Sequence, residues 1–206
     1  MTGERQPYWS DYLDPPPDFQ RYSPGGIVID IGCGPGEQLS LLRAAGCRPI
    51  GLEPFLETAA AAKALGYPIV VARAEQLPIR TGGVQGVLCK VVMPYTDEQL
   101  AVSEMGRILS PGGIVLLSLH GLGFYLRYLL RPDEWRHAAY AARTIANTLA
   151  YRITGRRLPG FLGDTIFQSD RRMRRYYRAS GLTLRSEVHS RKFLGRRVFF
   201  GHVLGK

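Results

Sequence analysis

Five residues near the start of the chain have the types and the spacing of a nucleotide site. Asp30 precedes a turn with Gly32, Gly34 and Gly36, and Glu53 follows seventeen residues after the last glycine. Glycines let a backbone approach a ligand closely and adopt positive φ, and a strand–turn–helix unit aims backbone N–H groups at an anion. A carboxylate at the end of the next strand can accept hydrogen bonds from both ribose hydroxyls. These residues predict a nucleotide-type ligand, with Asp30 orienting the glycine loop.

The glycine spacing separates two classes of nucleotide site. A dinucleotide oxidoreductase carries GxGxxG, in which the third glycine lets the helix pack against the strand. Here the third glycine comes one residue earlier, in Gly32-Cys33-Gly34-Pro35-Gly36, and Pro35 stiffens the turn. Asp30, the penultimate residue of the strand, is no part of the dinucleotide pattern either. The spacing therefore disfavours a nicotinamide oxidoreductase.

Alternating strands and helices would position this site. Short apolar runs predict strands, and helix formers that end at glycine or before proline predict helices. The expected order is strand 27–31, helix 37–45, strand 48–52, helix 55–65, strand 68–72, strand 86–92, helix 97–109 and strand 113–119. After residues 121–168, which show no regular strand–helix unit, we expect a helix at 170–179 and strands at 182–188 and 197–203. Such alternation requires right-handed crossovers and a parallel sheet covered on both faces.

The loop motif and three later segments resemble class I S-adenosylmethionine (SAM)-dependent methyltransferases. The first motif of that family is an acidic residue followed by GxGxG, as in Val28–Gly36 here. The other three segments follow in the family's order and spacing: Ile50–Pro54 with Glu53, Ala74–Pro78 (AEQLP) and Arg107–Gly113 (RILSPGG). One glycine motif would be weak evidence, whereas four ordered signals over residues 27–119 are specific. The chain is identified as a member of this family, of the small-molecule type.

The resemblance implies a fold and a cofactor. The fold would be a doubly wound, Rossmann-like α/β sheet of seven strands in the order 3-2-1-4-5-7-6, with the last strand antiparallel and a helical insertion after strand 5. Residues 1–206 would form a single methyltransferase domain with an N-terminal segment at 1–24. SAM, giving S-adenosylhomocysteine as product, would lie across the carboxyl ends of the first two strands. The implied cofactor-binding residues are Asp30, Gly32, Cys33, Gly34, Gly36, Glu53, Pro54, Ala74, Glu75 and Lys90.

Two positions depart from the family pattern. Arg73 stands where close relatives carry an aspartate near the adenine amino group, so Glu75 or a backbone carbonyl would make that contact. The usual Phe-Asp pair that opens the fourth strand is replaced by Val84-Gln85-Gly86. A non-catalytic SAM-binding module therefore stays open as an alternative. The retained glycine loop and Glu53 favour a working cofactor site.

Few residues are needed for the chemistry itself. Methyl transfer from a sulfonium is an in-line displacement that requires alignment and exclusion of water more than an acid or a base. A hydroxyl or amine acceptor would still benefit from a general base. His120, directly after the fifth strand, and Tyr95 are the catalytic candidates, with Lys90 behind them; each could also be an ordinary packing or surface residue. Cys33 has no base paired with it and is expected to be a small filler.

Residues 121–168 are expected to form a lid over the acceptor, because functional loops commonly sit on a rigid scaffold. Their aromatic residues suit an apolar or ring-bearing acceptor, and their arginines could hold an anionic group bidentately. Equally, the apolar part could cap the sheet while the arginines are solvated. The aromatic residues are Phe124, Tyr125 and Tyr128, and the arginines are Arg127, Arg131, Arg136, Arg143, Arg152, Arg156 and Arg157.

Composition and charge limit the alternatives. Three scattered cysteines predict neither disulfides nor a metal site, which indicates a reducing cytoplasm, and no apolar run is long enough to span a bilayer. Residues 1–110 carry nine basic and twelve acidic side chains, a net charge of −3, whereas residues 111–206 carry eighteen and five, a net charge of +13. The basic half suggests an anionic partner or simply solvated arginines.

The main prediction is methyl transfer from SAM to a small-molecule acceptor at oxygen, nitrogen or carbon. A lipid or quinone methyltransferase, with residues 121–157 resting on an anionic membrane, is one alternative, so peripheral membrane contact stays open. An RNA methyltransferase is another, although Pro94-Tyr95 lacks the Asn/Asp-Pro-Pro-aromatic sequence of amino methyltransferases and no RNA-binding appendage is visible. Nucleic acid is therefore not the favoured partner. The helix at 170–179, with Arg171, Arg172, Arg174, Arg175 and Arg178 almost all round it, would be a solvated surface or a phosphate-binding patch.

Overall fold

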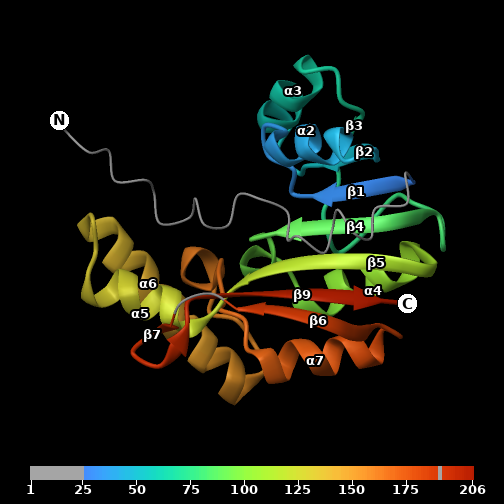
Figure 1. The fold of residues 1–206 in the computed structure, drawn as a ribbon. Coiled ribbons are helices and arrows are strands. Elements are labelled where there is room, and N and C mark those ends of the chain that lie inside the picture. The colour runs from blue at the N-terminus through green and yellow to red at the C-terminus, as the bar shows by residue number, and fades with distance from the viewer. Residues whose placement is uncertain (1–25, 190–191) are drawn as a thin grey trace.

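A seven-stranded sheet forms the centre of the fold, in the order β3-β2-β1-β4-β5-β9-β6 (Figure 1). The computed structural model describes residues 26–189 and 192–206, so the N-terminal segment predicted at 1–24 lies outside the described residues. Strands β1 to β5 pair in parallel, and β9 runs antiparallel to both β5 and β6. The predicted fold class and strand order are confirmed, with β9 as the antiparallel seventh strand. The strands are β1 (Ile27–Ile31), β2 (Arg48–Leu52), β3 (Ile69–Val70), β4 (Val84–Lys90), β5 (Leu109–His120), β6 (Thr183–His189) and β9 (Phe199–Gly205).

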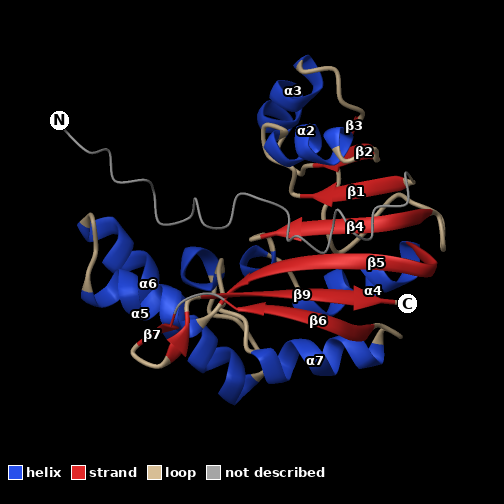
Figure 2. Ribbon diagram, viewed as in Figure 1, coloured by secondary structure: helices blue, strands red, loops and turns tan. Residues whose placement is uncertain are grey.

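Alternate residues of the strands are buried on the two faces of the sheet. Val87 and Val115 belong to a core shared with α4 and α7, whereas Leu88 and Leu116 belong to a second core shared with Leu42 of α2. Burial on both faces explains why these strands are continuous apolar runs in the sequence. Figure 2 shows the helices around this sheet. They are α2 (Glu37–Ala44), α3 (Leu56–Ala64), α4 (Glu98–Ile108), α5 (Leu122–Leu130), α6 (Trp135–Thr154) and α7 (Asp170–Ala179), with short 3₁₀ turns η2 (Met93–Tyr95) and η3 (Gly160–Gly163).

A buried ion pair joins α4 to α7. The guanidinium of Arg172 donates to the carboxylate of Glu98 through Nε at 2.6 Å and through Nη2 at 2.8 Å. Gln168 Nε2 also donates to Glu98, at 3.2 Å. Both charged side chains are almost fully buried, with 9% and 1% of their surface exposed. The expectation that arginines surround a solvated helix is therefore wrong at Arg172, which faces inward beside Met173 and Tyr177.

The insertion after β5 is helical, as predicted. The stretch at 122–130, whose aromatic residues were expected to contact an acceptor or cap the sheet, forms helix α5 of the predicted helical insertion. Its side chains Phe124, Tyr125 and Tyr128 pack with Phe167 and Phe199 in a separate core. A small hairpin of β7 (Lys192–Phe193) and β8 (Arg196–Arg197), which the sequence did not reveal, packs against α5. Helices α5 and α6 lie beyond the carboxyl ends of the parallel strands, where a lid would have to sit (Figure 1).

Most predicted boundaries agree with the structure to within a few residues. The strand expected at 68–72 is reduced to Ile69–Val70, and the strand expected from 113 already begins at Leu109. Within the described part of the chain, no helix has the length and apolar character needed to cross a bilayer.

Candidate active site

The glycine loop after β1 has the backbone that its sequence predicts. Gly32, Gly34 and Gly36 have φ values of 69°, 55° and 100°, in the left-handed region that favours glycine. A Cβ added to Gly32 would lie 2.3 Å from Cγ2 of Val92, so a side chain there is sterically blocked. An added Cβ at Gly34 meets nothing within 4 Å, which leaves the loop open on its outer side. The loop therefore forms a backbone cradle with free space beside it.

Glu53, at the end of β2, holds this loop in place. Its carboxylate accepts hydrogen bonds from the N–H of Gly34 at 3.1 Å and from the N–H of Phe55 at 3.2 Å. The side chain is buried and lines a cavity. Each carboxylate oxygen has more than one lone pair, so these bonds leave capacity for the predicted contacts with ribose hydroxyls.

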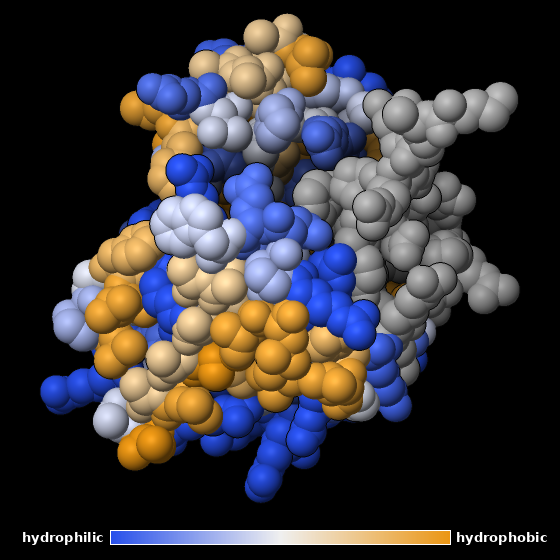
Figure 3. All heavy atoms as spheres, turned by 90° about the vertical axis from the view of Figure 1, so that its left-hand side faces the viewer, coloured by the Kyte–Doolittle hydropathy of each residue, from blue (hydrophilic) through white to orange (hydrophobic). Residues whose placement is uncertain are grey.

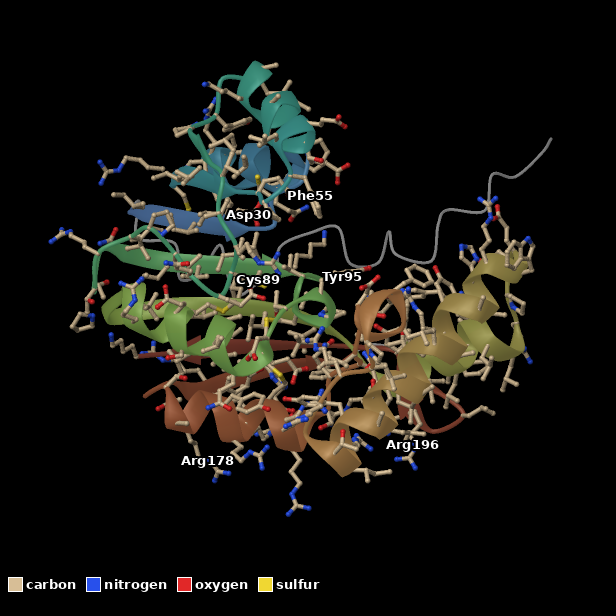
Figure 4. The ribbon with its side chains drawn as sticks, turned by 180° about the vertical axis from the view of Figure 1, so that it is seen from behind. Asp30, Phe55, Cys89, Tyr95, Arg178 and Arg196 are labelled. Atoms are coloured by element: carbon tan, nitrogen blue, oxygen red, sulfur yellow. The ribbon has the colours of Figure 1, made fainter. Side chains whose placement is uncertain are left out.

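The first cavity, of about 440 Å³, lies at the carboxyl ends of β1, β2 and β4. Pro54, Ala74, Glu75 and Lys90, all predicted to bind cofactor, line it together with Glu53 and Tyr95. The carboxylate of Glu75 already accepts from the N–H of Asp97 at 2.9 Å and lies 3.5 Å from Nε of Arg73. Figure 4 shows Asp30 of β1, Phe55 of the turn before α3 and Tyr95 of η2 at this end of the sheet.

A second cavity, of about 390 Å³, lies on the other side of the glycine loop. It shares Gly32, Lys90 and Val91 with the first cavity. One wall consists of the loop, with Asp30 and Gly34, and the opposite wall is aromatic. The aromatic wall comes from the end of β5, from α5 and from the start of β9: His120, Phe124, Tyr128 and Phe199.

Two ionisable residues line the second cavity, Asp30 and Lys90, and Lys90 also lines the first. Burial raises the pKa of Asp30 to about 7, the positive charge of Lys90 acts in the opposite direction, and the nearby Glu53 raises it further. Asp30 therefore changes charge near neutral pH. A positively charged ligand group beside it would favour the ionised form, so the site can couple ligand binding to loss of a proton.

The two predicted catalytic residues are not brought together. His120 is buried in the second cavity, where its ring stacks on Phe124 with 4.0 Å between the ring centroids. Burial lowers its pKa to about 3, so the imidazole is neutral at physiological pH and a weak base. Tyr95 lines the first cavity, is 53% exposed, and places its hydroxyl 3.4 Å from that of Tyr140 on α6.

Cys33 has the properties of a packing residue. Its side chain is buried with Leu39 and Ala62, and burial raises the pKa of its thiol to about 12. The thiol stays protonated at neutral pH and is a poor nucleophile. Gly51 makes room for it, because a Cβ on Gly51 would lie 2.5 Å from the sulfur.

Two features of the site could not be predicted from the sequence. Val91 has φ of 62°, a strained conformation for a β-branched residue, and it lines both cavities. Nothing in the residue type indicates such a backbone, since valine avoids it. Phe199 lies far along the chain and reaches the second cavity only because β9 pairs with β5.

Arg107 gives the RILSPGG segment a physical role. It forms an ion pair with Glu104 at 2.6 Å and donates to the carbonyls of Leu77 and Ile79 at 2.9 and 2.7 Å. Leu77 N–H in turn donates to Glu104 at 2.7 Å. These bonds fix the segment that continues from Ala74 and Glu75, and so they shape one wall of the first cavity.

Comparisons with known proteins agree with this geometry. Residues 29–117 match a family model described as a methyltransferase domain. An uncharacterized protein of Methanocaldococcus jannaschii is 35% identical over 97 residues, which is 46% of this chain and 37% of that protein. A mouse protein described as "probable tRNA methyltransferase 9B" is 33% identical over 106 residues, 48% of this chain and 23% of that protein. The chain thus spans less than half the length of these curated relatives.

A solved structure shares the fold along most of the chain. It is a SAM-dependent methyltransferase of Methanosarcina mazei, with a TM-score of 0.66 and 16% identity, covering 94% of this chain and 98% of that one. The family model over residues 29–117 and the shared fold agree with the predicted methyltransferase class. Residues 29–117, which include the glycine cradle and the buried Glu53, thus match a methyltransferase domain, and the chain has the fold of a SAM-dependent methyltransferase.

Proposed function

We propose that this chain transfers the methyl group of SAM to a small-molecule acceptor with an apolar, ring-bearing part. The observation that carries the proposal is the second cavity, whose walls are the glycine loop on one side and aromatic rings on the other. An acceptor held between these walls lies directly beside the loop that characterises the cofactor site. The acceptor atom, oxygen, nitrogen or carbon, stays a prediction.

In this proposal the parts of the cofactor are bound by residues of both cavities. Glu53 binds the ribose hydroxyls, and the backbone around Ala74 and Glu75 flanks the adenine in the first cavity. The loop backbone, Asp30 and Lys90 face the amino-acid part at the junction. When bound, SAM supplies a methyl group already activated by a sulfonium, so alignment is the main task left to the protein.

The aromatic wall would perform that alignment and exclude water. His120, Phe124 and Phe199 pack with ring centroids 4.0 to 5.4 Å apart and form a stiff surface. The neutral His120 can accept a proton, but its lowered pKa suits it better to positioning than to general-base catalysis. Tyr95, near Tyr140 at the edge of the lid, would contact the acceptor from the side of the first cavity.

Charge favours an apolar acceptor over a multiply anionic one. Among the described residues that line the second cavity, Lys90 is the single cation. Two lid arginines are engaged elsewhere: Arg143 pairs with Asp164 at 3.5 Å, and Arg157 donates to the backbone carbonyls of Thr96 and Asp164. The arginines of the insertion therefore act outside this cavity.

A second candidate is methyl transfer to RNA. The curated relatives include proteins described as tRNA methyltransferases, and the net charge of +13 on residues 111–206 suits a phosphate backbone. These relatives weaken the expectation against nucleic acid as a partner.

Transfer of a radioactive methyl group from SAM separates the two candidates. The purified chain would be supplied in parallel with bulk tRNA and with a panel of phenols, aromatic amines and isoprenoid quinols. We expect the label to appear in a member of the small-molecule panel. Phe124→Ala should reduce the rate of this methyl transfer by about tenfold or more, because the acceptor loses its contact with the ring. A matched Phe161→Ala variant, which removes an exposed ring outside the cavity, should retain full activity. Label in tRNA alone would overturn the proposal.

A further inference from the structure

The outer face of α6 is apolar along its whole length. Six residues three or four positions apart share this face and are exposed: Trp135, Ala139, Ala142, Ala146, Leu149 and Ile153. Exposure reaches 75% for Trp135, 49% for Leu149 and 84% for Ile153. At this end of the molecule, Figure 3 shows apolar residues gathered over the lower half and bordered by strongly hydrophilic ones.

This apolar stripe is not needed to hold α6 in the fold. The opposite face of the helix already does so, with Ala141, Thr144, Asn147 and Thr148 buried. Asn147 donates to the carbonyls of Gly163 and Thr165, at 3.0 and 2.7 Å. A helix needs only one buried face to pack, and a long exposed apolar face marks an interaction site.

The charges beside the stripe are all positive within the helix. Among its twenty residues α6 carries Arg136, Arg143 and Arg152 and no aspartate or glutamate. Arg143 pairs with Asp164, whereas Arg136 and Arg152 are exposed. A second copy seated on the stripe would bring these two arginines against the arginines of the other copy, which disfavours a symmetric dimer. An anionic surface complements them instead.

A cavity lined by arginines adjoins the same helix. Its volume is about 600 Å³, and α6 contributes Arg152 to it. Its remaining described lining comes from Ser169 and from Arg171, Arg172, Arg175 and Arg178 of α7. The Nη1 atom of Arg172 is buried and has no hydrogen-bond partner among the described residues, although Nε and Nη2 of the same side chain bind Glu98. A buried N–H group without a partner and several guanidinium groups around one cavity suit a phosphate.

We propose that the α6 stripe and this arginine cavity together dock the protein on an anionic phospholipid membrane. The stripe enters the boundary between headgroups and acyl chains, and the arginine cavity binds lipid phosphate. The apolar stripe decides between a membrane and RNA, because a nucleic-acid backbone offers nothing to an exposed row of alanine, leucine and isoleucine. A 20-residue helix is about 30 Å long, enough to contact several lipids while lying in the plane of the interface.

Docking at this face would bring the lid to the membrane. Helix α6 packs against α5, and α5 supplies Phe124 and Tyr128 to the second cavity. An acceptor that partitions into lipid would then reach the aromatic wall from the bilayer surface. This last step rests on the proposed function, whereas membrane binding itself does not.

Co-sedimentation with lipid vesicles tests the docking surface. The full chain would be mixed with vesicles of two parts phosphatidylcholine to one part phosphatidylglycerol, and with vesicles of phosphatidylcholine alone. We expect retention on the first kind only, weakened by salt. Leu149→Ser with Ile153→Ser should reduce binding by about tenfold or more through lost apolar contact. Arg175→Ala with Arg178→Ala should reduce it by about fivefold per arginine.

Matched variants at the other end of the sheet act as controls. Leu65→Ser and Arg48→Ala change an exposed leucine and an exposed arginine there, and should leave retention unchanged. All variants should bind SAM like the unaltered chain, which separates a failure of docking from a failure of the cofactor site. The proposal would be overturned if the unaltered chain were not retained on anionic vesicles. It would also be overturned if the Leu149/Ile153 variant or the Arg175/Arg178 variant were retained as well as the unaltered chain. A dimer in sedimentation velocity that Leu149→Ser with Ile153→Ser dissociates would overturn it too, as would tRNA binding that needs Arg175 and Arg178 without vesicle binding.

Discussion

Residues 27–119 and residues 121–206 form their candidate binding surfaces in different ways. In the first region, the site is made mainly from backbone: three glycines with positive φ, a strained Val91 and one carboxylate that ties the loop to β2. In the second region, side chains dominate, with an aromatic wall, an exposed apolar stripe and many arginines. The comparison teaches that the cofactor chemistry is set by local geometry, whereas the choice of partner depends on surfaces assembled from distant segments.

The largest expected effect concerns the buried ion pair that joins the two regions. Glu98→Ala would leave Arg172 buried without its partner, and we expect a loss of about 3–5 kcal/mol in the free energy of unfolding. Urea denaturation measures this loss. Glu57→Ala, which removes an exposed glutamate in the first turn of α3, should change stability by about 0.5 kcal/mol or less. Equal effects of the two substitutions would show that the α4–α7 ion pair does not hold the regions together.

The next effect separates cofactor binding from backbone strain. Gly34→Ala and Gly46→Ala both place a Cβ on a residue with positive φ, and neither Cβ meets an atom within 4 Å. Each should therefore lower stability by about 1–2 kcal/mol. Gly34 alone lines the second cavity, so only Gly34→Ala should weaken SAM binding, by about tenfold or more. Calorimetric titration with SAM measures the affinity of each variant. Equal SAM affinity in the two variants would place the cofactor elsewhere.

A further effect should appear in the dependence of stability on pH. The pKa of Asp30 is raised by burial from 3.8 to about 7, so the folded state holds a proton that the unfolded state has lost. Its contribution to stability is complete below about pH 4 and is lost as the pH rises through about 7. In thermal melts of the cofactor-free protein, Asp30→Asn should remove this decline between pH 4 and 7. Parallel curves for the two proteins would contradict the buried location of this carboxyl group.

His120 should affect the dependence of stability on pH with the opposite sign. Burial lowers its pKa from 6.5 to about 3, so the folded state resists protonation. The contribution to stability is present above pH 6.5 and is lost as the pH falls toward 3. His120→Phe keeps an aromatic ring against Phe124 and should make the acid limb of the stability curve shallower. An unchanged acid limb would indicate that the imidazole is hydrated in the folded state.

The same contrast explains what the sequence could and could not predict. Strands β1 and β2 and the glycine loop with Glu53 are local patterns, in which each residue type follows from its own backbone position. The bounds of helix α5 within the helical insertion were missed because Gly123 and the aromatic residues around it weaken the helical signal, while packing in the aromatic core supplies the stability. Arg172 gives no sign of burial, since it lies in a run of arginines and its partner Glu98 is 74 positions away. The aromatic wall likewise depends on β9 pairing with β5.

The central claim is that the loop of residues 30–36 and Glu53 form a SAM site. Titration of the purified protein with SAM, S-adenosylhomocysteine and NAD, beside Glu53→Ala and the control Glu57→Ala, tests it most directly. We predict binding of both adenosyl ligands, no binding of NAD, and a loss of about tenfold or more in Glu53→Ala alone, because the ribose hydroxyls lose a charged acceptor. Tight binding of NAD, or adenosyl ligands bound equally by Glu53→Ala, would contradict the account.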